Sequence, residues 1–279
     1  MSCFNKVAIL GPGLLGGSIA LAIQKKIPAT EVSLWGRKEK VIEQVRQAGF
    51  PSATSDLQLA VKGADLIILA VPVGVMPTLV KQLDLSQDVL VTDVGSVKRS
   101  VHESLSSLFD GQQASFIGSH PMAGSERAGF SAAHADLLDG AACIITNDGG
   151  THSDKLENLK NFWQQLGLII RELNAEDHDY AVARISHFPH TMASITATVG
   201  LDFEDLADLA GGGMRDTTRV AAGDPSLWTE ILMENADALQ RSLAECMVHL
   251  ETVSKILKEK DQATLHNYLT VAKHKRELI

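Results

Sequence analysis

The 279-residue sequence has few cysteines, no excess of positive charge and no long uninterrupted apolar run. Its three cysteines, Cys3, Cys143 and Cys246, form no CxxC pair and have no regular spacing. This pattern argues against a disulfide framework or a thiolate metal site and favours a reducing, cytoplasmic location. Asp and Glu (34) outnumber Lys and Arg (25), and the resulting net charge of −9 argues against nucleic acid as a partner.

The sequence also lacks a predicted signal peptide, membrane span, repeat or low-complexity tract. The first apolar run begins at Val7 without a basic leader, and glycine and proline residues between 11 and 17 interrupt it. A chain of this length with 45% hydrophobic residues is long enough for two packed cores. We therefore expect a globular protein with two domains.

Up to residue 173, short β-branched runs alternate with longer amphipathic segments. The expected strands are 6–10, 31–35, 66–71, 88–94, 115–117, 141–146 and 168–173. The expected helices are 14–26, 38–48, 75–83, 97–108 and 153–166. This alternation is typical of βαβ units and predicts an α/β fold with an open, doubly wound, mainly parallel sheet of the Rossmann type.

After residue 173 the strand-like runs stop, and apolar residues recur with the helical period of about 3.6 residues. This pattern is clearest in 227–257 and 262–273, so an N-terminal domain, 1–173, is expected to be followed by an all-helical domain, 174–279. Pro189 lies within a predicted helix from 175 to about 199. A proline there removes a backbone donor and predicts a kink near His187.

A glycine-rich turn lies between the first expected strand and the first expected helix. In this GxGxxG pattern, Gly11 suits the tight turn, Gly13 lets a pyrophosphate approach the backbone, and Gly16 allows the helix to pack on the strand. The first residues of the helix, Leu14 and Leu15, follow with backbone N–H groups directed at the phosphates. The pattern predicts dinucleotide binding by domain 1–173; the alternative is a turn without a ligand.

The second expected strand is not followed by the acidic residue that binds the ribose 2′-hydroxyl in NAD enzymes. Gly36, Arg37 and Lys38 occupy that point instead. The glycine leaves room, and the two cations suit a 2′-phosphate, with a planar guanidinium for bidentate recognition. NADP is therefore favoured over NAD, although Arg37 and Lys38 could instead only open a solvated helix.

The next strand ends lie where open α/β sheets bind ligands. Val71 and Pro72 end the third strand, and Gly95 and Ser96 follow the fourth, so all four are expected to contact the cofactor. Ser96 is expected at the start of a helix, where its hydroxyl either caps that helix or meets a ligand over the nicotinamide. His120 is expected in a loop after the fifth strand, where a histidine is either simply exposed or placed for proton transfer.

These motifs belong to a larger set of sequence blocks. The blocks are GPGLLGGS at 11–18, TDVGSVK at 92–98, GSHPMAG at 118–124, HD and ISHFPH within 178–190, and GGGMRDTTRVAAGDP at 211–225. In order and spacing they resemble the prephenate/arogenate dehydrogenase family of tyrosine biosynthesis, over essentially the whole chain. GxHPMAG and GGGxRDxTR are specific to that family, whereas many dehydrogenases share the glycine block.

The resemblance implies that the chain oxidatively decarboxylates arogenate to tyrosine, prephenate to 4-hydroxyphenylpyruvate, or both. His120 resembles the family's catalytic histidine, which accepts the proton of the ring hydroxyl, and Ser96 resembles its hydrogen-bonding partner at that hydroxyl. Hydride passes to the nicotinamide and the ring carboxylate leaves as carbon dioxide, so no catalytic metal is expected. His120 must be neutral to act as a base, so activity should fall below its pKa.

The resemblance also implies a substrate site in the helical domain. Arg219 resembles an arginine that clamps a substrate carboxylate, and Arg215 would face the same side if the segment is helical. His187 matches a histidine of the substrate pocket, and His190 follows three residues later. The alternatives are a surface ion pair between Arg215 and Asp216, and histidines that only pack in the core or, without a third partner, bind a metal.

Other features bear on partners and on substrate choice. Asp179 and Glu126 are candidates for contacting the keto or amino group that distinguishes prephenate from arogenate. An apolar stripe, together with the resemblance, predicts a homodimer through the helical domain; it comprises Leu227, Ile231, Leu232, Leu239, Leu243, Met247, Leu250 and Ile256. No chorismate mutase segment is expected before Met1 and no regulatory domain after Lys273, which leaves tyrosine feedback at the active site open.

Two other functions share parts of this pattern. A β-hydroxyacid-type dehydrogenase would have the same fingerprint and a helical domain, but that group uses a lysine in the helical domain, and no lysine lies between Lys160 and Lys255. A non-catalytic NADPH-binding sensor would need only the fold. Ser96, His120 and Arg219 argue against such a sensor, and turnover would exclude it.

Overall fold

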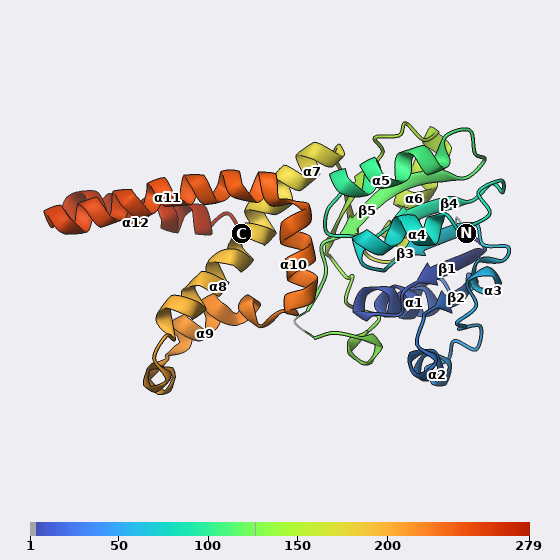
Figure 1. The fold of residues 1–279 in the computed structure, drawn as a ribbon, viewed down its shortest axis with the longest axis horizontal. Coiled ribbons are helices and arrows are strands. Elements are labelled where there is room, and N and C mark those ends of the chain that lie inside the picture. The colour runs from blue at the N-terminus through green and yellow to red at the C-terminus, as the bar shows by residue number, and fades with distance from the viewer. Residues whose placement is uncertain (1–3, 126) are drawn as a thin grey trace.

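The computed structural model describes residues 4–125 and 127–279, except for the side chains of 204 and 205. An α/β domain is followed by a helical domain that extends away from it (Figure 1). The sheet has seven strands in the order β2-β1-β3-β4-β5-β6-β7. The strands are β1 (Lys6–Leu10), β2 (Glu31–Trp35), β3 (Leu66–Leu69), β4 (Leu90–Asp93), β5 (Ser115–Pro121), β6 (Ala142–Thr146) and β7 (Ile169–Glu172).

All neighbouring strands are parallel except β5 and β6, which run antiparallel. The expected doubly wound, mainly parallel sheet is therefore confirmed. The strand order reverses at β1, which lies between β2 and β3, and in such sheets ligands bind outside the carboxyl ends of the strands at this point.

Side chains of β1 alternate between two apolar cores, one on each face of the sheet. Val7 and Ile9 pack into one core, whereas Ala8 and Leu10 pack into the other. Helices α1 (Leu14–Lys26), α2 (Glu39–Gln47) and α6 (Ser153–Gln165) contribute to the first core, and α3 (Leu57–Val61), α4 (Met76–Val80) and α5 (Arg99–Phe109) contribute to the second. Two 3₁₀ turns, η1 (Val73–Val75) and η2 (Phe130–Ala132), complete this domain. The short helix α3 was not predicted.

The rest of the described chain is helical, as expected. Its elements are α7 (Ala175–Val182), η3 (Ala183–His187), α8 (Phe188–Gly200), η4 (Glu204–Leu209), α9 (Gly212–Thr218), η5 (Arg219–Ala222), α10 (Pro225–Glu234), α11 (Ala236–Glu259) and α12 (Gln262–Arg276). The expectation of one helical run over 227–257 is wrong, because the chain turns at Asn235 and α10 leaves the line of α11 (Figure 1).

Where a kink near His187 was predicted, the structure has an irregular helical turn. The segment η3 is a π-helix that ends at His187, and Pro189 is the second residue of α8. A proline cannot donate the backbone hydrogen bond of a regular α-helix, and a π-turn accommodates the missing bond. His187 is thereby placed at the irregular turn of a continuous helical segment.

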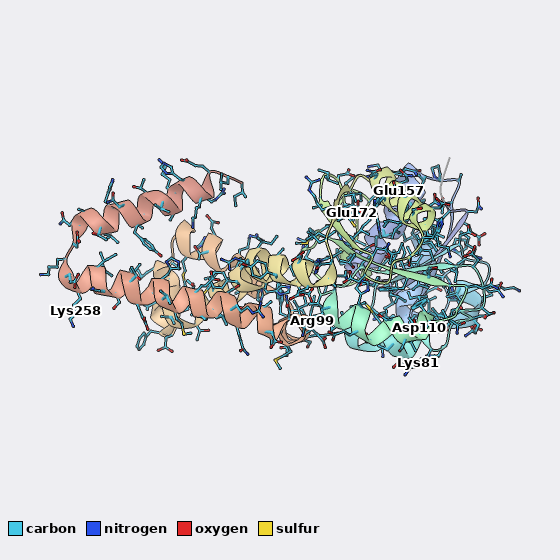
Figure 2. All side chains as sticks on the ribbon, turned by 90° about the horizontal axis from the view of Figure 1, so that it is seen from above. Lys81, Arg99, Asp110, Glu157, Glu172 and Lys258 are labelled. Carbon is cyan, nitrogen blue, oxygen red and sulfur yellow. The ribbon has the colours of Figure 1, made fainter. Side chains whose placement is uncertain are left out.

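Helices α11 and α12 project furthest from the sheet, with Lys258 at their far end and Arg99 at the junction of the two domains (Figure 2). The predicted apolar stripe is divided: Ile231, Leu239 and Ile256 are buried, whereas Leu227, Met247 and Leu250 are exposed. Within the described residues, no helix is both long and apolar enough to span a membrane.

Candidate active site

A cavity of about 640 Å³ lies between the carboxyl ends of the central strands and the helical domain. Its wall includes Gly13, Ser96 and His120 from the α/β domain and His187 and Arg219 from the helical domain. A cleft of this size between two domains is typical of a site for a cofactor and a small substrate. The structure thus brings together residues that lie more than 200 positions apart in the sequence.

The glycine turn forms one wall of this cavity. Gly11 has a φ of +115°, and a Cβ atom at this position would lie 2.2 Å from the carbonyl oxygen of Ala70. A Cβ at Gly16 would lie 2.1 Å from the oxygen of Gly11, so both positions require glycine. A Cβ at Gly13 would meet nothing within 4 Å, and Gly13 lines the cavity with Leu14, Leu15 and Gly16. The open cradle at the start of α1 fits a pyrophosphate.

This contrast predicts different effects for valine at two of these glycines. Gly13→Val should leave the melting temperature nearly unchanged but weaken dinucleotide binding by about tenfold or more, because the new side chain fills the space beside α1. Gly11→Val should lower the melting temperature, because a valine is strained at positive φ and collides with the backbone. Thermal unfolding and fluorescence titration measure the two effects, and tight dinucleotide binding by folded Gly13→Val would contradict the expected phosphate position.

The residues after β2 lie outside the cavity wall. A Cβ at Gly36 would lie 2.9 Å from Cγ of Pro12, so this glycine also permits close packing against the glycine turn. Arg37 and Lys38 are exposed, and Lys38 directly precedes α2. Within the described part of the chain, neither cation has an ion-pair partner.

Val71, Pro72, Gly95 and Ser96 all line the cavity. The expectation that Ser96 begins or caps the following helix is wrong, because α5 begins at Arg99 after Lys98 in the N-cap position. The first N–H groups of this helix are satisfied by a carboxylate from the helical domain. Ser96 therefore lies in the loop before α5, where it lines the cavity.

His120 lies in strand β5 and not in a loop, which corrects the prediction. The strand extends to Pro121 because its last residues pair with β6, with His120 opposite Ile144. The histidine is only 8% exposed and lines the cavity. Burial lowers its pKa well below the usual value, and the proximity of His178, the Lys98 ammonium group and His187 further disfavours a positive charge on this ring and lowers that pKa.

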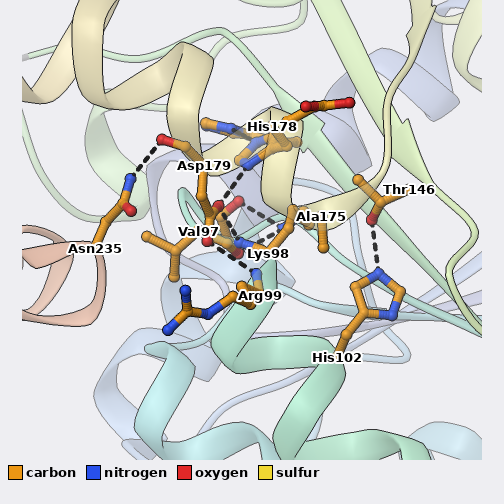
Figure 3. A network of polar contacts seen from close by, with 12 residues as sticks. Val97, Lys98, Arg99, His102, Thr146, Ala175, His178, Asp179 and Asn235 are labelled. Atoms are coloured by element: carbon orange, nitrogen blue, oxygen red, sulfur yellow. Dashed lines mark hydrogen bonds and ion pairs between the residues drawn. The ribbon is translucent and has the colours of Figure 1, made fainter. Parts of the chain in front are cut away.

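A series of hydrogen bonds connects His120 to the start of α5. Figure 3 shows the part of this series around His178, Asp179 and Arg99. Nδ1 of His120 lies 2.8 Å from Nε2 of His178, and Nδ1 of His178 lies 2.7 Å from Oδ1 of Asp179. The two Asp179 oxygens accept the backbone N–H groups of Lys98 (2.7 Å) and Arg99 (2.9 Å). His178 was not predicted as a site residue, and its position in the HD motif gave no indication of this contact.

Asp179 does not occupy the position expected for it beside the substrate side chain. It is 6% exposed, it does not line the cavity, and both of its oxygens are hydrogen-bonded. Burial alone would raise its pKa, but the hydrogen bonds from His178, Arg99 and Lys98 outweigh burial and the net pKa is lowered. The other candidate, Glu126, lies outside the described residues.

A buried ion pair closes the loop that carries Ser96. Nζ of Lys98 lies 2.6 Å from Oδ2 of Asp93, and both side chains are fully buried. The same ammonium group donates to the carbonyl oxygens of Gly95 (2.8 Å) and Val97 (3.1 Å). Three acceptors thus satisfy the three protons of Lys98 and connect the end of β4 to the start of α5.

His187 and His190 differ in their surroundings. His187 lines the cavity, and burial lowers its pKa to about 4. Nδ1 of His187 lies 3.2 Å from Nδ2 of Asn235, whereas its Nε2 has no partner in the described part of the chain. His190 does not line the cavity; it stacks on Trp228 with ring centroids 3.5 Å apart. Its observed contact is therefore with the cavity wall.

Arg219 and Arg215 are also separated by the structure. Arg219 lines the cavity as the first residue of η5. Arg215 lies within α9, is exposed and does not line the cavity. Because the α-helix ends at Thr218 and continues as a 3₁₀ turn, the α-helical spacing that would place both side chains on one face is not maintained.

Glu230 of α10, another cavity residue that sequence reasoning missed, joins the two domains. Its Oε1 accepts the backbone N–H of Gly74 at 3.0 Å, next to the start of α4. An acidic residue on an amphipathic helix carries no sequence signal for such a contact. Among the described residues, no group of three or more His, Cys, Asp or Glu side chains could hold a metal ion.

Comparison with known proteins gives two adjoining family matches. Residues 19–171 match the model described as prephenate dehydrogenase, nucleotide-binding domain, and residues 174–271 match the model described as prephenate dehydrogenase, dimerization domain. The chain is 35% identical over 270 residues to prephenate dehydrogenase of Lactococcus lactis subsp. cremoris, covering 94% of this chain and 74% of that protein.

Solved structures show the same similarity over nearly the whole chain. The crystal structure of prephenate dehydrogenase from Aquifex aeolicus in complex with hydroxyphenyl propionate and NAD+ has a TM-score of 0.90 and 27% identity, covering 98% of this chain and 97% of that chain. The structure of Synechocystis arogenate dehydrogenase has a TM-score of 0.80 and 30% identity, covering 98% and 99%. These similarities support a nicotinamide cofactor for the α/β domain.

Proposed function

Because the chain belongs to the prephenate dehydrogenase family, we propose that it is an NADP-preferring enzyme that oxidatively decarboxylates arogenate, prephenate or both. The observation that carries this proposal is one cavity that joins the glycine turn to Ser96, His120 and Arg219. The products would be tyrosine from arogenate and 4-hydroxyphenylpyruvate from prephenate. Relatives with each of the two substrates in their names support both possibilities.

In this proposal the residues of the cavity bind the substrate and accept one proton. Arg219 binds a carboxylate with its planar guanidinium, and Ser96 hydrogen-bonds the ring hydroxyl. His120, neutral and shielded from solvent, accepts the proton of that hydroxyl. The oxidised nicotinamide, when bound, supplies the hydride acceptor. His187 donates a hydrogen bond to a substrate oxygen, whereas Arg215 and His190 act only indirectly or across a subunit interface.

The preference for NADP depends on Arg37 and Lys38, which have no partner in the described part of the chain. Arg37→Ala should raise the KM for NADP by about tenfold or more and leave the KM for NAD nearly unchanged, because only NADP has the 2′-phosphate. Lys40→Ala is the matched control, since Lys40 is also exposed but lies one turn further along the chain. Equal effects of Arg37→Ala on the two cofactors would contradict the proposed NADP preference.

The lowered pKa of His120 predicts the position of the acid limb of the rate profile. The histidine accepts a proton only in its neutral form, and its lowered pKa keeps it neutral to a lower pH than an ordinary histidine. The value of kcat/KM should therefore fall only as the pH decreases below about 6.5, the ordinary histidine pKa. A profile with its acid midpoint at or above that pH would contradict this assignment, and His249→Gln should not move the midpoint.

We also propose that the helical domain forms a homodimer in a reducing, cytoplasmic location. The family description of residues 174–271 as a dimerization domain supports the homodimer. Exposed apolar side chains along α11 supply a surface for a second copy; they include Met247, Val248, Leu250 and Leu257. Both described cysteines, Cys143 and Cys246, are free thiols, which is compatible with a reducing location.

The experiment that tests the proposed function is a turnover assay with prephenate and arogenate, each offered with NADP and with NAD. Formation of the reduced cofactor, followed by its absorbance, with faster turnover for NADP, is the expected result. The ratio of kcat/KM values for the two substrates would identify the preferred one. Absence of turnover in all four combinations, from folded protein that binds NADP, would overturn the enzyme assignment in favour of a sensor.

A further inference from the structure

Each of the two cavity histidines is held through only one of its ring nitrogens. His120 is bonded through Nδ1 to His178, and His187 is bonded through Nδ1 to Asn235. In both rings Nε2 has no hydrogen-bond partner among the described residues. A neutral imidazole has one donor nitrogen and one acceptor nitrogen, so the partner at Nδ1 determines what Nε2 presents to a substrate.

The series of hydrogen bonds that ends at His120 begins at the carboxylate of Asp179. This carboxylate accepts two backbone N–H groups at the start of α5, where the helix dipole favours negative charge. An ionised carboxylate can only accept, so Nδ1 of His178 must donate to it. Burial lowers the pKa of His178, so its ring is neutral and its Nε2 is an acceptor. Nδ1 of His120 therefore donates to His178, which leaves the lone pair on Nε2 of His120.

The series of hydrogen bonds that ends at His187 begins at the backbone carbonyl oxygen of Asp179. This carbonyl accepts a hydrogen bond of 2.8 Å from Nδ2 of Asn235, which fixes the orientation of the amide group (Figure 3). The same NH₂ group lies 3.2 Å from Nδ1 of His187, so Nδ1 is the acceptor. The proton of the neutral His187 ring is then on Nε2, opposite to the arrangement in His120.

We propose that Asp179 is a positioning residue that fixes opposite tautomers of the two cavity histidines, so that Nε2 of His120 accepts a proton and Nε2–H of His187 donates a hydrogen bond. Its side chain acts on His120 through His178, and its carbonyl group acts on His187 through Asn235. The inference rests on the proposed function, for which it supplies the base and the donor in the required forms. The tautomers of the two histidines can be measured without enzyme turnover.

The direct test is ¹⁵N NMR of the full-length protein with labelled histidine, since imidazole ¹⁵N shifts and two-bond couplings distinguish the two tautomers. Spectra of His120→Asn and His187→Asn assign the two rings among the ten histidines. The expected result is a protonated Nδ1 in His120 and a protonated Nε2 in His187. A protonated Nε2 in His120, or a protonated Nδ1 in His187, would overturn the proposal whether or not the protein turns over prephenate.

Asp179→Asn tests the side-chain half of the network. The amide has a single accepting oxygen, so its NH₂ group must face the N–H of either Lys98 or Arg99, and His178 no longer meets an ionised carboxylate. The His120 tautomer should then no longer be fixed in one form, while the His187 tautomer stays unchanged. We expect kcat to fall by about 10²-fold or more with KM little changed, as when the carboxylate behind a catalytic imidazole is replaced. Asp177→Asn, on the exposed side of the same helix, is the matched control.

A pair of substitutions at His178 separates positioning from packing. His178→Gln retains an oxygen that can accept from Nδ1 of His120, whereas His178→Leu removes the acceptor and keeps an apolar side chain in the buried site. The glutamine variant should recover much of the kcat lost in the leucine variant and keep the His120 tautomer. Equal kcat values for folded forms of both variants, with the same His120 tautomer, would overturn the positioning role.

Discussion

Replacing His120 with asparagine is expected to lower kcat for prephenate or arogenate by about 10²- to 10⁴-fold, the usual contribution of a general base. Asparagine retains a polar side chain of similar reach but cannot accept the hydroxyl proton. His120 lines the cavity, and its Nε2 has no partner among the described residues. The substitution therefore removes the nitrogen that is proposed to accept the substrate proton. Steady-state rates measure the change.

The design of this experiment separates chemistry from binding and folding. His120→Asn should bind the nicotinamide cofactor as tightly as the unchanged protein, because the glycine turn and the loop after β4 are not altered. His152→Asn is the control for a general histidine effect, since His152 is exposed at the start of α6. A value of kcat within a factor of about two of the unchanged enzyme, well below the effect of a lost base, would exclude His120 as the base.

The parts of the site that could be predicted from the sequence depend on local geometry. Gly11, Gly13 and Gly16 are recognisable because backbone sterics and phosphate access dictate glycine within six consecutive residues. The cavity also contains Ser96, because parallel strands bring their carboxyl ends to one edge of the sheet. Both predictions follow from the order of strands and helices alone.

The parts that could not be predicted depend on contacts between distant segments. His178 lies 58 positions from His120, and no periodicity marks which side of α7 meets strand β5. Asn235 ends a helix without a proline or glycine, so the pattern of apolar residues continued across it. His120 itself was expected in a loop because Pro121 suggested a strand end, whereas pairing with β6 extends β5 through the proline.

Contacts between the two domains surround the cavity and support its geometry. Asp179 holds the start of α5, Glu230 holds Gly74 before α4, and Arg99 lies 3.7 Å from Asp237 at the junction. His120, the proposed base, and the loop of Ser96 belong to the α/β domain, whereas His187 and Arg219 belong to the helical domain. We expect the distance between cofactor and substrate groups to depend in part on these contacts, so small changes at the junction should affect kcat more than cofactor binding.

Lys98→Met is expected to lower the free energy of unfolding by about 3–5 kcal/mol, the cost of leaving one partner of a buried ion pair uncompensated. Lys98 and Asp93 are both fully buried, and the substitution leaves Asp93 with only the N–H groups of Gly95 and Ser119. Chemical denaturation, with the slope checked for two-state behaviour, measures the loss. Lys25→Met is the control, because its ion pair with Asp136 is exposed and should contribute little.

A double-mutant cycle with Asp93→Asn identifies the cause of this destabilisation. If the unpaired charge is responsible, the double variant Lys98→Met/Asp93→Asn should be less destabilised than the sum of the two single variants, since neither buried charge remains. Additive losses would show that packing of the lysine side chain, and not charge, is what the fold requires. Because the same ammonium group holds the carbonyls of Gly95 and Val97 on either side of Ser96, a charge-driven loss should be accompanied by weaker substrate turnover at temperatures where the protein is still folded.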